Sequence, residues 1–151
     1  MSDLALEWPA DQTLQGDLAV DASGDLLTCD LDVEARQRVT RRLLTNPRQL
    51  SSDGLVVLPP EYIFDGTYGV GLRRMVGSAV NSRNAQTLKQ TVLDGVLQED
   101  VVAPNPPPAV AVTSSNAGVA SPPPSGGFLV AVTFTSASTS RPVSTPRITI
   151  S

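Results

Sequence analysis

Two stretches of the chain carry apolar residues at three- and four-residue spacing, the pattern of an amphipathic helix. The first stripe consists of Leu31, Ala35, Val39 and Leu43, with Leu44 alongside. The second consists of Ala85, Leu88, Val92 and Val96, with Leu93 and Leu97 alongside. Asp30 or Asp32 can cap the first helix and Thr45-Asn46-Pro47 ends it, while Asn81 or Asn84 can cap the second. The pattern therefore predicts two main helices.

Alternating and β-branched runs predict strands near both ends of the chain. An N-terminal hairpin is expected around the turn at residues 21–25, with Leu14, Gly16, Leu18 and Val20 before it and Leu26, Leu27 and Cys29 after it. Residues 109–113, 128–135 and 147–150 predict three C-terminal strands separated by Pro- and Gly-rich loops. The alternative is a flexible low-complexity tail. We expect an α+β fold with an N-terminal β-hairpin, two main helices and C-terminal antiparallel strands.

The middle of the chain has weaker periodicity. Residues 46–67 form a long excursion in which Asp53-Gly54 and Pro59-Pro60 flank an apolar run. Residues 68–71 then form a tight turn into a short segment at 72–76. We divide the chain into an N-terminal arm, residues 1–13, and one domain, residues 14–151, with Pro-rich loops at 104–108 and 121–127.

The amino-acid composition excludes several kinds of catalytic, metal-binding and disulfide site. The 151 residues include no His and one Cys, with a formal charge of −4. Without His there is no Ser-His-Asp machinery or imidazole metal site, and Cys29 alone makes no internal disulfide or thiolate zinc site. The negative charge argues against nucleic acid, and no apolar run reaches the roughly 18 residues of a membrane span. The start lacks a secretion signal. We expect a soluble protein made inside the cell, without cofactor or metal, that is not an enzyme.

Carboxylates are the remaining candidate catalysts. A glycosidase needs two of them flanking a cleft. The obvious pairs are Asp17 with Asp25, in the expected hairpin, and Glu99 with Asp100, at a helix end. Acids in turns and near helix ends are usually solvated, so catalysis is not favoured.

Several residue groups are candidates for partner binding. Arg36, Arg38, Arg41 and Arg42 suit helix-dipole complementation with intramolecular pairing, or a charged protein contact. Tyr68, Arg73 and Arg74 are of the types that anchor interfaces. The last strand, Arg147, Ile148, Thr149 and Ile150, offers an open β-edge to another chain. The alternative is a strand closed inside its own sheet. We also expect deletion of residues 144–151 to leave folding largely intact.

The order of these elements resembles the baseplate wedge, or sheath-initiator, family of contractile phage tails, which is also called lysozyme-like. It includes protein W-like and Mu-like phage relatives. The resemblance is carried by Gly-Asp-Leu at 16–18 and 24–26, by Ala-x-x-Arg-x-x-x-Arg-Leu-Leu-Thr at 35–45 and by Tyr-Gly-x-Gly-Leu at 68–72. In element order it covers residues 14–151. Relatives often have Glu-Pro-Arg after the last helix, where this chain has Glu99-Asp100-Val101.

The resemblance implies a fold similar to the polymerising domain of sheath subunits. It implies a structural role in the virion, in a baseplate ring of six copies assembled in the bacterial host cytoplasm. The implied partners are the tail sheath protein, the baseplate wedge proteins and the tail tube or hub. The first sheath ring would be templated by β-strand exchange. Two alternatives stay open: a cell-wall glycosidase, and a monomeric binding module that recognises its partner through the Pro-rich loops.

Overall fold

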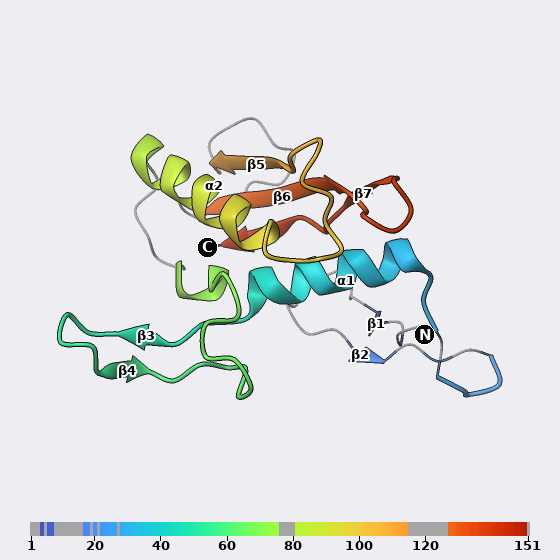
Figure 1. The fold of residues 1–151 in the computed structure, drawn as a ribbon, viewed down its shortest axis with the longest axis horizontal. Helices are drawn as coiled ribbons and strands as arrows, with labels where there is room; N and C mark the ends of the chain where they lie inside the picture. Colours follow the sequence, from blue (N-terminus) through green and yellow to red (C-terminus); the bar gives the residue numbers. More distant parts are fainter. Residues whose placement is uncertain are drawn as a thin grey trace.

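A computed structural model describes residues 4, 6–7, 17–18, 20, 22–26, 28–75, 81–114 and 127–150. The elements are, in order, β1 (Leu6–Glu7), β2 (Asp17–Leu18), α1 (Leu31–Leu44), β3 (Gln49–Leu50), β4 (Val56–Leu58), the 3₁₀ helix η1 (Leu72–Met75), α2 (Ser82–Val96), β5 (Ala109–Ser114), β6 (Phe128–Thr135), β7 (Pro142–Ser144) and β8 (Ile148–Ile150). All described strand pairs are antiparallel, and the predicted α+β class is confirmed (Figure 1).

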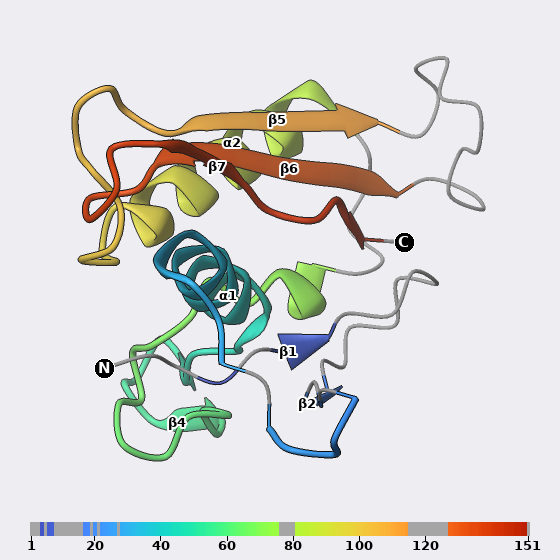
Figure 2. The ribbon, with the colours of Figure 1, turned by 90° about the vertical axis from the view of Figure 1, so that its right-hand side faces the viewer.

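The first helix begins and ends where its sequence predicts. The Val33 N–H donates to Asp30 Oδ1 at 2.8 Å, and the helix ends at Leu44, where Thr45 leaves helical geometry. The apolar stripe is buried except for Leu31, which was expected to join it but is 51% exposed at the start of the helix. Gln37, Thr40 and Arg42 are buried as well. The reason is that α1 lies between two layers, with the C-terminal sheet and α2 on one side and the N-terminal strands and the β3–β4 hairpin on the other (Figure 2). Of the four arginines of this helix, Arg42 therefore lies on the buried side.

The second helix packs its predicted face against the sheet. Asn81 caps it by accepting the Asn84 N–H at 2.8 Å, and Leu88, Val92 and Val96 are buried. Leu97 was expected on this face, but it is exposed because the helix ends at Val96 and the chain turns away. Gly95 allows a close approach, since a Cβ there would lie 2.3 Å from Val70 Cγ2.

The C-terminal region is an ordered four-stranded sheet. Its central strand is β6, which pairs with β5 on one side and with β7 and β8, one after the other, on the opposite side. The strands expected at 109–113, 128–135 and 147–150 are confirmed, and β7 is an additional one. Strand β7 begins at Pro142, within a region expected to be a Pro-rich loop, and a proline is tolerated at the first residue of an outer strand.

A local bulge separates β7 from β8. The Thr145 N–H donates to the Val132 carbonyl at 2.9 Å, and the Val132 N–H donates to Thr145 Oγ1 at 3.1 Å. A threonine side chain thus replaces one backbone acceptor of the ladder where Pro146 follows. This side-chain hydrogen bond keeps both short strands on the same side of β6.

The sheet and the helices enclose one hydrophobic core. Along β6, Phe128, Val130, Val132 and Phe134 alternate inward, while Thr133 between them is exposed. Ile148 and Ile150 of β8 join the same core, as does the stripe of α1 from Ala35 to Leu44. Each such side chain contributes about 1.5–3 kcal/mol when fully buried. The core therefore lies between α1, α2 and the sheet.

The N-terminal strands pair differently from the sequence-based expectation. The turn at residues 22–25 is present, but around it the described residues form a single bridge between Val20 and Leu26. The strand partner of β2 is β1, from the expected arm, with Leu6 opposite Leu18. Local turn chemistry predicted the turn but not this more distant pairing. The expected positions at 14, 16 and 27 lie outside the described residues, as do 121–126 of the second Pro-rich loop, and the division at residue 13 stays a prediction.

The long excursion at 46–67 contains a hairpin that projects from the body (Figure 1). Strands β3 and β4 are joined by a turn in which the Gly54 N–H donates to Ser51 O at 3.0 Å. The Tyr68–Gly71 turn then closes the end of α1, because the Val70 N–H donates to Arg42 O and the Gly71 N–H to Thr45 O, both at 2.9 Å. The predicted turn and short segment are thus confirmed, with η1 ending at Met75.

Candidate interaction site

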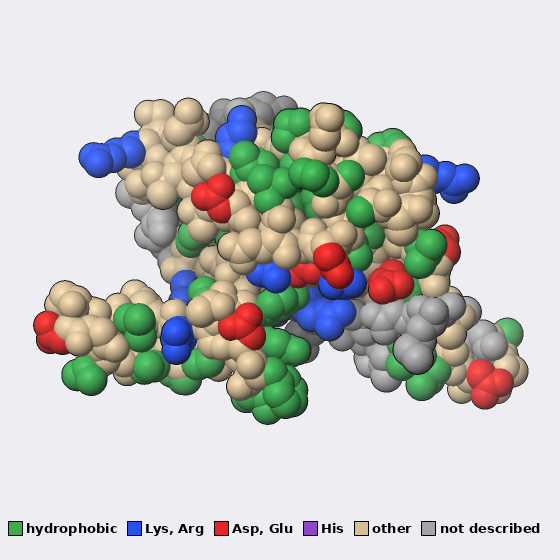
Figure 3. All heavy atoms as spheres, viewed as in Figure 1, with side chains coloured by type: hydrophobic (Ala, Val, Ile, Leu, Met, Phe, Trp, Pro, Cys, Tyr) green, Lys and Arg blue, Asp and Glu red, His purple; other side chains and the backbone are tan. Residues whose placement is uncertain are grey.

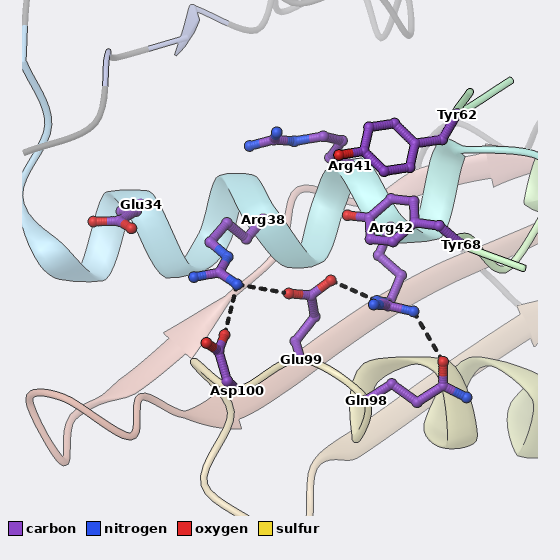
Figure 4. Close-up of a pocket in the computed structure, with 9 residues that line it drawn as sticks. All are labelled: Glu34, Arg38, Arg41, Arg42, Tyr62, Tyr68, Gln98, Glu99 and Asp100. Carbon is purple, nitrogen blue, oxygen red and sulfur yellow. Dashed lines mark hydrogen bonds and ion pairs between the residues drawn. The ribbon is translucent and has the colours of Figure 1, made fainter. Parts of the chain in front are cut away.

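An open cavity of about 580 Å³ lies where α1, the end of α2 and the loop before η1 meet (Figure 4). Its walls are polar and aromatic and come from three separate parts of the chain. The lining residues are Glu34, Arg38, Arg41, Arg42, Tyr62, Tyr68, Gln98, Glu99 and Asp100. This cavity is where the structure gathers its charged and tyrosine side chains.

The floor of the cavity is a buried ion pair between Arg42 and Glu99. Arg42 Nε donates to Glu99 Oε1 at 2.5 Å, and Arg42 Nη1 donates to Gln98 Oε1 at 2.9 Å. The Glu99 side chain is 4% exposed and that of Arg42 is 11% exposed. Removing one member of such a pair leaves an uncompensated buried charge and typically costs about 3–5 kcal/mol. The pair therefore joins the two helices as well as forming part of the cavity.

A second arginine connects the floor to the rim. Arg38 Nη2 lies 3.4 Å from Glu99 Oε2 and donates to Asp100 Oδ1 at 2.6 Å. The expected intramolecular pairing of the arginine cluster is confirmed for Arg38 and Arg42. Their partners, Glu99 and Asp100, come from the segment that follows α2. Arg36 and Arg41 have exposed side chains.

The positions of Arg42 and Glu99 follow from helical geometry. Arg42 comes seven residues after Ala35, so it lies on the same buried face of α1. Glu99 follows Val96 by three residues and is 5% exposed as a whole residue, so the expectation of a surface acid is wrong. An arginine on an apolar stripe is the sequence signal that predicts a buried acidic partner. The partner itself is 57 residues away and has no local signature.

An aromatic chain leads from this ion pair to the molecular surface. The Arg42 guanidinium carbon lies 4.3 Å from the centroid of the Tyr68 ring, a cation–π contact. The Tyr68 and Tyr62 centroids are 5.0 Å apart, and those of Tyr62 and Phe64 are 5.6 Å apart with an edge-on arrangement. Phe64 is 82% exposed. The chain therefore links a solvent-facing ring to the buried pair.

Electrostatics keep the Tyr68 hydroxyl protonated. Burial raises the pKa of Tyr68 above its usual value of 10.0, and the nearby Glu99 carboxylate raises that pKa further. A neutral phenol can donate and accept hydrogen bonds but is neither a base nor a nucleophile near neutral pH. Tyr68 thus suits recognition.

The cavity has no excess of either charge. Its three arginines are matched by Glu34, Glu99 and Asp100. Both Glu99 oxygens face arginine side chains, so neither is directed toward an approaching glycosidic bond. For the other carboxylate pair, Asp25 is exposed, and the Asp17 side chain lies outside the described atoms. A neutral, Tyr- and Arg-rich hollow has the composition of a protein–protein contact.

The predicted residues of the turn and of η1 have different roles. Tyr68 lies in the cavity. Arg74 donates to the carbonyl oxygens of Pro47 and Pro59, the latter at 3.0 Å, so it holds the base of the hairpin. Arg73 is exposed on η1. The structure therefore pairs Tyr68 with Arg42, where the sequence suggested Arg73 and Arg74.

The last strand is part of the protein's own sheet. Phe128 of β6 lies opposite Ile150, and Val130 lies opposite Ile148. Both isoleucines are buried, Thr149 is half-buried and Arg147 is exposed. A partner at this margin would meet backbone, not the isoleucine side chains. Deletion of residues 144–151 would remove two core side chains, which argues against the expectation that folding stays largely intact without them.

Neither α1 nor α2 is long and apolar enough to cross a membrane. In the described part of the chain, no group of three or more Cys, Asp and Glu side chains is placed to hold a metal ion. Comparison with protein-family models, with curated proteins and with solved structures found no match.

Proposed function

We propose that the protein is a structural subunit of a contractile phage-tail baseplate that joins the wedge to the sheath. In this role it nucleates sheath assembly by β-strand exchange. The proposal rests on the resemblance in element order over residues 14–151. It is supported by the α+β fold, with a capped α1, the Tyr68–Gly71 turn, α2 and a terminal antiparallel sheet in the order that the resemblance requires.

The observation that carries the proposal is the shape of the C-terminal sheet. Among the described strands, β5 and β8 each pair with β6 alone, so both are outer strands. An extended arm of a sheath subunit can add to an outer strand through main-chain hydrogen bonds, with side-chain alternation fixing its register. Because β6, α1 and α2 share one core, a force applied through such an arm would be transmitted to both helices.

The second part of the proposal is that the cavity binds a baseplate wedge protein. Glu99 stands just after the last helix, where relatives often have the Glu of Glu-Pro-Arg. Here it binds Arg42 from α1, and Asp100 binds Arg38. The exposed Arg41 and the rings of Tyr62 and Tyr68 remain at the rim to meet a partner. The wedge surface that fits would be polar and close to neutral.

Sheath nucleation in vitro tests the strand-exchange step. The purified chain would be mixed with a tail sheath protein, and sheath rings counted by electron microscopy. Thr149→Lys places a charge on the outer strand β8, and charged side chains oppose edge pairing. We expect it to reduce nucleation at least tenfold.

The matched control is Thr133→Lys, because Thr133 is exposed on the central strand β6 of the same sheet. It should nucleate as the unmodified chain does. Equal nucleation by both variants, at equal folded content by circular dichroism, would argue against exchange at β8. Binding of neither sheath nor wedge protein by the unmodified chain would overturn the proposed function as a whole.

A further inference from the structure

The large apolar side chains that the described residues expose are not scattered. Eight lie in and after the β3–β4 hairpin, and we call them the arm patch: Leu50, Leu55, Val56, Val57, Leu58, Tyr62, Ile63 and Phe64. Four lie near the start of the chain, and we call them the N-terminal patch: Leu4, Val20, Leu26 and Leu31. Outside both patches, within the described part of the chain, the one further example is Leu97.

The arm patch is exposed because the hairpin has no covering layer. Among the described strands, β4 pairs with β3 alone, and all three residues of β4 are exposed although consecutive side chains point to opposite faces. Leu55 is 71% exposed and Ile63 is 81% exposed. Two-stranded hairpins are marginally stable in water, and large exposed apolar surfaces usually mark contact sites. The arm patch therefore has the properties of a contact site.

The N-terminal patch lies at the opposite end of the long axis. Antiparallel bridges join Val20 to Leu26 and Leu4 to Thr28, which keeps three of its members on neighbouring segments. Figure 1 shows the hairpin at one end and the loop of residues 22–26 at the other. Figure 3 shows hydrophobic side chains along the projecting hairpin and also on the body, with charged side chains in the region between the two.

We infer that the arm patch of one copy docks on the N-terminal patch of a second copy. The two patches differ and lie at opposite ends, so the contact is head-to-tail, and successive copies form a ring if the rotation between them closes. A specific interface usually buries at least about 1,000 Å² in total, so a contact between two patches of this size would be a small one. The association is accordingly weak for one contact and concentration-dependent.

A second copy is the occupant that the surface distribution favours. The chain itself presents both halves of the contact, and each half consists of exposed apolar side chains. Apart from Tyr62, which also lines the cavity, this contact uses residues that the proposed function does not, and it requires neither sheath nor wedge. If sheath nucleation fails, the contact between copies is not contradicted. If the copies do not associate, the sheath-nucleation hypothesis is not contradicted either.

Sedimentation velocity of the full chain, from micromolar to several hundred micromolar, tests the inference. We expect the mean mass to rise with concentration to several times that of one copy. Val57→Glu in the arm patch and Leu26→Glu in the N-terminal patch should each give a monomer throughout. Leu97→Glu is the matched control, because it places the same charge on an exposed apolar residue outside both patches, and it should associate as the unmodified chain does.

Mixing the two monomeric variants decides the geometry. Val57→Glu keeps its N-terminal patch and Leu26→Glu keeps its arm, so an equimolar mixture should form a one-to-one dimer that grows no further. Association by Leu26→Glu alone would show an arm-to-arm contact and overturn the head-to-tail inference. A monomeric unmodified chain at every concentration would overturn it as well. Circular dichroism melting of each variant separates lost contact from lost folding.

Discussion

The strands β4 and β6 consist of similar residues in opposite surroundings. Val130 and Val132 of β6 have 0% exposure, whereas Val57 of β4 is 57% exposed. Strand β6 has neighbours on both sides and helix α2 packs on its sheet, while β4 has one described neighbour and no covering layer. Composition therefore predicts that a segment is a strand, but the packing of other elements decides whether that strand is core or contact surface.

The largest effect should come from the buried pair that ties α1 to α2 in the body. Glu99→Ala leaves Arg42 buried without its carboxylate, and we expect the free energy of unfolding to fall by about 3–5 kcal/mol. Urea denaturation followed by circular dichroism measures it. Asp100→Ala, on an exposed neighbour in the same cluster, should change stability by less than about 1 kcal/mol.

Replacing both partners sharpens this result. Arg42→Met combined with Glu99→Leu removes both charges and keeps similar volume, so it should recover most of the loss. A double variant as unstable as Glu99→Ala alone would contradict the charge argument. It would indicate instead that the hydrogen bond from Arg42 to Gln98 or the cation–π contact with Tyr68 stabilises the junction.

The two strands can be compared directly by the same substitution. Val132→Ala opens a cavity in the core and should cost about 2 kcal/mol. Val57→Ala removes the same two methyl groups from an exposed side chain and should stay within about 0.5 kcal/mol. Thermal unfolding at a concentration low enough to keep the chain monomeric measures both. Equal losses would mean that the arm is covered within the single chain.

Local signals predicted most of the body. The Asp30 and Asn81 caps and the apolar stripes of α1 and α2 are encoded within a few residues, and so are the runs that became β5 and β6. Strand β7 was missed because Pro142 resembles a breaker and because a three-residue strand has too short a pattern. The pairing of β1 with β2 was missed because it depends on long-range contacts.

The site was predictable only in part. Tyr68 was selected for its residue type and its turn, and it does lie in the cavity. Arg42 could have been singled out, since seven residues separate it from Ala35 on the buried stripe of α1. Its partner Glu99 could not, because ion pairing between distant segments leaves no spacing rule in the sequence. The exposure of Val56, Val57 and Leu58 likewise depends on what fails to pack against them.

The smallest expected effect concerns pH and the ring between the buried pair and the surface. Burial, and then the Glu99 carboxylate, raise the pKa of Tyr68 in the folded protein, while in the unfolded chain it stays near 10.0. Above pH 10 the unfolded state therefore loses this proton first, and stability falls as pH rises through the folded-state pKa. Tyr68→Phe has no such proton, so its stability should fall less between pH 9 and pH 11 than that of the unmodified chain. Urea midpoints across that range measure the difference. The contacts with Arg42 and Tyr62 indicate that Tyr68 is shielded from solvent, and parallel curves for the two proteins would contradict this.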